Sequence, residues 1–93
     1  MNVRDAVHVA IQHVQSLFES ENLTNLGLEE VEFDHTENEW VVTVGFSRPW
    51  DYPKNALAAL SNQGGQPRRA FKIVRIRDGD HEVIAVKNRP TDE

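Results

Sequence analysis

The chain of 93 residues is 39% hydrophobic and 27% charged, carries a formal net charge of −5 and contains no cysteine. This length suits one small domain with a single core, residues 1–93, and leaves little volume for a deep catalytic pocket. The lack of cysteine excludes disulfides, thiolate chemistry and any metal or cluster site built on cysteine ligands.

The first segment has the spacing of an amphipathic helix. Its apolar residues recur three and four positions apart and form one stripe: Val3, Ala6, Val7, Ala10, Ile11, Val14, Leu17 and Phe18. Asn2 is a suitable N-cap, and Asp5 three residues later can complete a capping box. The pattern predicts a helix from about Val3 to Glu19, with Val9 alone on the opposite side.

The next two segments alternate as β-strands do. In residues 29–34, Val31 and Phe33 alternate with acidic residues, which predicts a half-buried strand. Residues 39–47 predict a second strand with two distinct faces: Trp40, Val42, Val44 and Phe46 on one, and Val41, Thr43, Gly45 and Ser47 on the other. The polar stretch between them predicts a hairpin turn, and residues 21–27 are expected to form a loop.

A long irregular stretch follows, and a second hairpin closes the chain. Pro49 and Pro53 stop the preceding strand, and the sequence leaves open whether residues 54–66 are helical or disordered. Residues 69–77 predict a strand whose apolar pattern changes phase at Ile73-Val74, where we expect a bulge. Asp-Gly at 78–79 predicts the turn into a last strand, residues 82–88.

In that last strand Ile84 and Val86 are expected on one face, and Val83 and Ala85 on the other. The tail, residues 89–93, is expected to fray. The order of elements therefore predicts an α+β fold: an N-terminal helix packed on a four-stranded antiparallel sheet, with a long loop or short helix between the two hairpins.

The closing hairpin carries a resemblance to a known family. The stretches 69–76 (RAFKIVRI) and 78–83 (DGDHEV) resemble the last hairpin of cystatin-like domains, including the small PepSY-type domains, where an aromatic-rich strand turns through Asp/Gly into a Gly-Glu-Val strand. Asp80-His81 departs from that pattern at the expected second glycine. Together with residues 40–46 (WVVTVGF), the hairpin is also similar to small bacterial proteins. The resemblance implies a cystatin-like shape and the binding of other proteins, without a mechanism.

Charge is divided unevenly along the chain. Residues 1–40 hold one basic and nine acidic residues, whereas residues 41–93 hold nine basic and six acidic ones. This division can guide a charged partner, or acidic and basic strands can satisfy each other within the fold. We favour the internal pairing.

No motif for catalysis or for metal binding is present. His8 and His13 are five residues apart on the expected helix and do not share a face, and His35 and His81 belong to turns. The sequence also lacks a phosphate-binding loop and any spacing typical of a catalytic triad. We therefore predict a protein that is not an enzyme, with no cofactor and no metal.

A basic run offers one candidate binding site. Five basic residues precede Asp78 without an intervening acid: Arg68, Arg69, Lys72, Arg75 and Arg77. With Phe71 among them, such a strand could hold a nucleic acid by phosphate contacts and stacking. Side chains alternate along a strand, however, so the sequence favours a basic strand that faces the acidic residues of 30–34.

The segment after the second strand offers another candidate. Arg48, Trp50 and Tyr52 lie between two prolines, and these three residue types are frequent at the energetic centre of protein interfaces. The alternative is that Trp50 and Tyr52 cover an open end of the core, which the sequence slightly favours because so small a domain needs each apolar contact.

These features together predict a small non-catalytic protein-interaction module of the accessory, inhibitor or immunity type. It would act through Arg48, Trp50 and Tyr52 and through a second apolar sheet face with Val41 and Thr43, which the long loop, a partner or a second copy in a homodimer would cover. A nucleic-acid-binding domain and a small-ligand pocket near Trp40 are the alternatives. With no signal-peptide core and no long apolar run, we expect a cytoplasmic location and no membrane.

Overall fold

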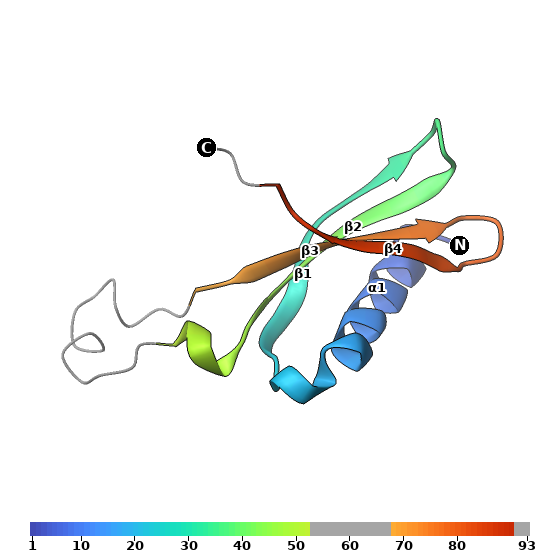
Figure 1. The fold of residues 1–93 in the computed structure, drawn as a ribbon. Helices are drawn as coiled ribbons and strands as arrows, with labels where there is room; N and C mark the ends of the chain where they lie inside the picture. The colour runs from blue at the N-terminus through green and yellow to red at the C-terminus, as the bar shows by residue number, and fades with distance from the viewer. Residues whose placement is uncertain (53–67, 91–93) are drawn as a thin grey trace.

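One helix lies against one face of a four-stranded antiparallel sheet (Figure 1). The structure, a computed structural model, describes residues 1–52 and 68–90. Its elements in chain order are helix α1 (Val3–Leu17), a 3₁₀ turn (Glu19–Glu21), strand β1 (Thr24–Asp34), strand β2 (Glu39–Ser47), a 3₁₀ turn (Pro49–Asp51), strand β3 (Ala70–Arg77) and strand β4 (Val83–Asn88). The predicted α+β class is confirmed. The prediction for residues 54–66 lies outside the described residues.

Helix α1 begins where the sequence predicts. The Asp5 amide donates to Asn2 Oδ1 at 2.8 Å and the Asn2 amide donates to Asp5 Oδ2 at 3.4 Å, which confirms the capping box. The helix ends at Leu17, two residues earlier than predicted, because the chain tightens into a 3₁₀ turn over Glu19–Glu21. Asn22 then takes a left-handed conformation (φ 55°), which turns the chain into β1.

The first hairpin is longer than the sequence predicts. Strand β1 begins at Thr24 rather than at residue 29, so the loop predicted over residues 21–27 is wrong from Thr24 onward. Thr24 pairs with Ser47 and Gly27 with Gly45, and one register shift lies between these two pairs. A second shift, between Leu28 and Glu30, separates them from the regular ladder that follows. Such shifts break the two-residue alternation that identifies a strand in the sequence.

The second hairpin has its irregularity in a different place. Strand β3 pairs with β2 in regular register from Ala70 to Arg77, so the bulge predicted at Ile73-Val74 is wrong. The shift lies between β3 and β4, where Ile84 is the extra residue. Val83 therefore pairs with Ile76 and packs against the core, instead of sharing a face with Ala85 as predicted.

The core lies between α1 and the sheet. Eight residues there are fully buried: Ala6, Ala10, Val14, Val42, Val44, Phe46, Val74 and Ile76. The helix meets the sheet through two alanines and a valine, whose short side chains allow a close approach. Val9, expected to face away, is half-buried against the edge of this core. The sheet face opposite the helix is left for other contacts.

Candidate interaction surfaces

The first candidate surface is the aromatic turn, which we define as residues 48–52. Trp50 lies on the 3₁₀ turn that follows β2, and its side chain is 53% exposed. The Arg48 guanidinium carbon lies 5.1 Å from the centre of the Trp50 ring and 5.7 Å from that of Phe46. Arg48 thus connects an exposed aromatic ring to a ring of the core.

Asp51 fixes the conformation of this turn. Its Oδ2 accepts from the Arg48 amide at 2.8 Å and from Arg48 Nε at 3.1 Å. Burial of the carboxylate opposes its ionisation, but the hydrogen bonds from Arg48 outweigh this and hold the pKa of Asp51 below its usual value. The ionised Asp51 therefore holds Arg48 in place beside Trp50.

Tyr52 ties the end of the turn to β1. Its hydroxyl lies 2.7 Å from Thr24 Oγ1 and accepts from Asn25 Nδ2 at 3.1 Å. The Arg68 amide donates to the Asp51 carbonyl at 2.9 Å, which joins the start of the next described segment to the turn. These bonds hold the aromatic turn against the sheet.

The two rings of the aromatic turn keep much of their surface open to solvent. Trp50 is linked to the buried ring of Phe46 through Arg48, which lies against both rings. Tyr52 is 37% exposed although its hydroxyl is bonded. The expectation that these two rings cap the core stays a prediction.

The second candidate surface is the open face, which we define as the sheet face opposite α1. Its members, taken from the register of the strands, are Glu30, Glu32 and Asp34 on β1, Glu39, Val41, Thr43 and Gly45 on β2, Phe71, Ile73, Arg75 and Arg77 on β3, and Ala85 and Lys87 on β4. Val41 and Ile73 are half-buried and Thr43 is 4% exposed. Both predicted residues, Val41 and Thr43, lie at its centre.

Ion pairs cross this face from β3 to β1. Arg75 Nη1 lies 3.1 Å from Asp34 Oδ2 and 2.9 Å from Glu39 Oε1. The Glu37 amide and then Arg75 hold the pKa of Asp34 below its usual value. The basic strand does meet the acidic one, but across β2 rather than as direct neighbours, and at Asp34 rather than at Glu30 or Glu32.

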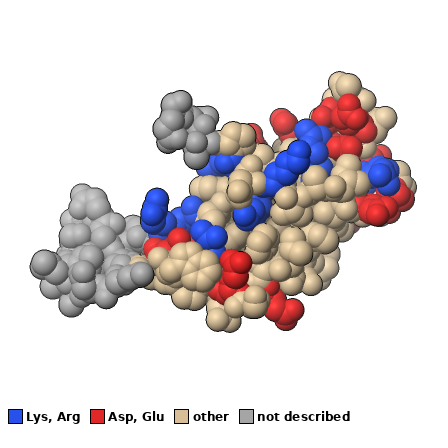
Figure 2. All heavy atoms as spheres, in the orientation of Figure 1, with Lys and Arg blue, Asp and Glu red and all other residues tan. Residues whose placement is uncertain are grey.

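The five basic residues of the nucleic-acid hypothesis do not form one surface. Lys72 lies on the helix side of the sheet, where its Nζ is 5.2 Å from the centre of the Phe18 ring and bonds to Asn88 Oδ1. Arg69 Nη2 is paired with Glu29 at 3.1 Å, and Arg77 is paired with Asp80 at 2.9 Å. In Figure 2 the Lys and Arg side chains lie in a diagonal band on the face shown, and acidic side chains lie both at the hairpin tips and along the lower edge of the molecule.

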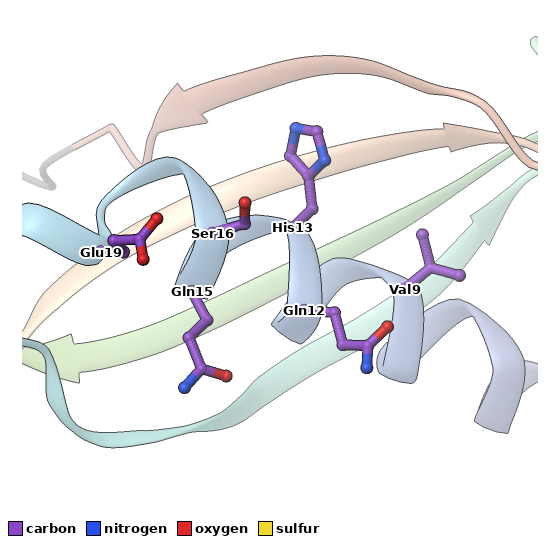
Figure 3. A pocket seen from close by; sticks show the side chains of 6 residues that line it. All are labelled: Val9, Gln12, His13, Gln15, Ser16 and Glu19. Atoms are coloured by element: carbon purple, nitrogen blue, oxygen red, sulfur yellow. The ribbon is translucent and has the colours of Figure 1, made fainter.

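A shallow hollow on α1 carries polar side chains with the potential for chemistry. It is lined by Val9, Gln12, His13, Gln15, Ser16 and Glu19, which fan out over the helix in Figure 3. Within the described residues, no hydrogen bond joins His13 to Ser16 or to Glu19, and no three His, Asp or Glu residues cluster as metal ligands. This hollow has no oriented catalytic group.

A further hollow of about 460 Å³ lies between α1 and β1, and its lining is mostly apolar. Trp40, near which a small-ligand pocket was considered, lines none of the hollows described. Its indole Nε1 instead donates to Asp78 Oδ1 at 2.9 Å, and its ring packs edge-on against Phe33. A small-ligand pocket near Trp40 therefore stays a prediction.

Sequence reasoning missed the residues that fix the aromatic turn. Asp51, three residues after Arg48 and two after Pro49, has the spacing of a helix-start cap, so a local signal was present. Thr24 and Asn25 have no such signal, because they lie 28 and 27 residues from Tyr52 and reach it only through the pairing of β1 with β2.

Comparison with known proteins adds no further assignment. No family model, no curated protein and no solved structure matches this chain. The resemblance to cystatin-like domains therefore stays a prediction. Within residues 1–52 and 68–90, no helix has both the length and the apolar character needed to cross a bilayer.

Proposed function

We propose that this protein is a small non-catalytic protein-interaction module, of the accessory, inhibitor or immunity type, that binds its partner through the aromatic turn. The observation that carries the proposal is the exposure of Trp50 on a turn whose backbone and neighbours are held in place. Trp50 is 53% exposed, whereas Arg48 and Asp51 beneath it are joined by two hydrogen bonds.

The energetics of binding favour such an arrangement. An exposed Trp beside an Arg and a Tyr offers a large contact area, and these three residue types dominate the energetic centres of interfaces. Because Asp51 and the Tyr52 hydroxyl already hold the turn, little conformational entropy is left to lose when a partner binds.

Nucleic-acid binding has less support. It requires a basic surface on which several cations are available to phosphates. Here Arg69, Arg75 and Arg77 each have an acidic partner within the chain, and Lys72 lies on the helix side.

The proposal is tested by quantitative affinity capture with wild-type protein, Trp50→Ala and Leu17→Ala. Leu17 is a matched control, since it is 56% exposed but lies on α1. We expect a partner that Leu17→Ala retains and Trp50→Ala loses, with a fall in affinity of about tenfold or more when the purified pair is measured. An identical set of captured proteins for wild type and Trp50→Ala would contradict the proposal.

A fluorescence measurement then locates the contact. In Trp40→Phe, Trp50 is the sole tryptophan, because the chain contains only two. The partner identified by capture should shift the emission of Trp50 to shorter wavelength as it removes the ring from water. An unchanged spectrum at saturation would place the interface elsewhere.

A further inference from the structure

The open face is ordered by charge from one edge of the sheet to the other. In one row across the strands the register aligns Glu30 on β1, Thr43 on β2, Ile73 on β3 and Lys87 on β4. An acid stands at one edge, a base at the other, and two residues with little or no exposed polarity lie between them. The row therefore ends in a negative charge on β1 and a positive charge on β4.

The two charged ends of this row cannot pair within one chain. Glu30 and Lys87 lie on the outer strands, three strand spacings apart, which is about 14 Å. Both side chains are exposed, and among the described residues neither takes part in an ion pair. Each is thus available to a group outside the chain.

A second copy of the chain carries the oppositely charged side chain that each of these two residues lacks. A two-fold axis that runs parallel to the strands, between β2 and β3, lays β1 of one copy over β4 of the other. Glu30 then faces the partner's Lys87 at both ends of the interface, and Thr43 faces the partner's Ile73. We propose that a second copy docks on the open face with this symmetry, in a contact separate from the aromatic turn.

The other two-fold arrangement of the same faces is unfavourable. An axis perpendicular to the strands would place β1 over β1. The acidic side chains of Glu30 and Glu32 would then face those of the other copy, and like charges repel. Charge therefore selects one of the two symmetric ways to stack these faces.

The neighbouring rows are compatible with this contact. The row of Arg75 holds the exposed Glu32 at the β1 edge and the half-buried Val41 and Ala85. The charge of Arg75 is already neutralised by Asp34 and Glu39. Arg75 thus brings no unpaired charge to the centre. The surface that a second copy would cover has Val41 and Ile73 near its middle, beside charges that are already paired within the chain. Glu30 and Lys87, which take part in no ion pair among the described residues, lie at its two edges.

The open face is small for a protein interface. Four strands about 4.8 Å apart and some eight residues long cover roughly 500 Å², so two faces together bury roughly 1,000 Å². This lies at the lower limit for a specific interface, and we expect a dimer that dissociates on dilution.

The test is the solution mass measured by sedimentation over a dilution series at low salt, for wild type, Glu30→Lys and Lys87→Glu. Each reversal makes two attractive contacts repulsive and should raise the dimer Kd about tenfold. Glu37→Lys, an equal change of charge at the β1–β2 turn, should leave the Kd within about threefold of wild type.

Mixing the two reversed variants is the decisive step. In the mixed dimer, Lys at position 30 faces Glu at position 87 and Glu30 faces Lys87, so both contacts are restored and the Kd should return close to that of wild type. Restoration also shows that both variants are folded. A wild-type protein that stays monomeric throughout, a dimer unaffected by either reversal, or a mixture that is not restored would each overturn the proposal.

Discussion

At Gly45 the lack of a side chain allows an ion pair to cross the sheet. A Cβ atom at this position would lie 2.6 Å from Arg69 Nη2 and 2.9 Å from Glu29 Oε2. The same guanidinium also donates to the Asn25 carbonyl at 2.8 Å, so Arg69 joins the start of β3 to β1 over the top of β2. Because the atoms in the way are the ends of two long side chains, they and not the backbone would move.

Substitution of Gly45 measures this contact. We expect Gly45→Ala to lower the free energy of unfolding by less than about 1 kcal/mol, the usual range of an exposed ion pair. In an Arg69→Ala background the contact with Arg69 is gone and Glu29, no longer held by its partner, can turn away from position 45. The same substitution should then be neutral or stabilising, since Ala suits a strand better than Gly.

Chemical denaturation of wild type, both single variants and the double variant gives the coupling between the two positions. A cost of Gly45→Ala that is the same with and without Arg69 would show that the Arg69–Glu29 pair does not occupy the space above Gly45.

At the scale of the element, α1 depends on two alanines for its distance from the sheet. Ala6 and Ala10 are fully buried, whereas the larger residues of the same stripe, Val3 and Leu17, are 48% and 56% exposed. The helix therefore meets the sheet most closely at Ala6 and Ala10, while the larger Val7 and Ile11 are half-buried beside this line.

Enlarging that line should destabilise the fold. Ala10→Leu inserts three carbon atoms into a site with no free surface, and we expect a loss of about 1–3 kcal/mol in the free energy of unfolding. Gln12→Leu, on the exposed side of the same helix, should change it by less than about 0.5 kcal/mol.

Thermal unfolding followed by circular dichroism compares the two variants. Equal effects of Ala10→Leu and Gln12→Leu would mean that the helix can move away from the sheet without cost.

What the sequence predicted at this scale depends on how local each signal is. The start of α1 was found because the capping box needs only Asn2 and Asp5. The start of β1 was missed because residues 24–28 pair with β2 through two register shifts, which remove the alternation. The sequence predicted a bulge in β3, because apolar residues lie on both of its faces: Phe71 and Ile73 on the open face, then Val74 and Ile76 toward the helix. The extra residue lies instead in β4.

The candidate surfaces follow the same rule. Trp50 and Tyr52 were found by residue type and by the prolines around them, a local signal. The charge order of the open face depends on which strands are neighbours, and so it appears only when the register places Glu30 and Lys87 at the two ends of one row.

At the scale of the whole molecule, carboxylates make the fold sensitive to acid. The pKa values of three carboxyls, those of Asp34, Asp51 and Asp80, are held below the usual value. Burial opposes the ionisation of each, but hydrogen bonds outweigh it. Asp34 accepts from Glu37 and Arg75, Asp51 from Arg48, and Asp80 from Arg77. A carboxyl with a lowered pKa stabilises the folded state above its unfolded pKa of about 3.9, and this contribution is lost as the pH falls through the folded value.

The free energy of unfolding should therefore fall as the pH drops below about 4. Asp34→Asn should be less stable than wild type near pH 7, where the wild-type carboxylate is ionised and paired with Arg75. The difference should shrink below about pH 4, because a protonated Asp34 resembles Asn. Urea denaturation of both proteins between pH 7 and 2 measures it, and a constant difference across this range would contradict the assignment.

The order of the strands in the sheet also bears on how the chain acquires its structure. The spatial order β1-β2-β3-β4 repeats the order in the sequence, and every strand pairs only with its neighbours along the chain. No strand has to be inserted between two others that are already paired. During synthesis each new strand can add to the edge of a sheet that the ribosome has already released, on a helix made before any of them, so the fold can grow in the direction of translation without rearrangement.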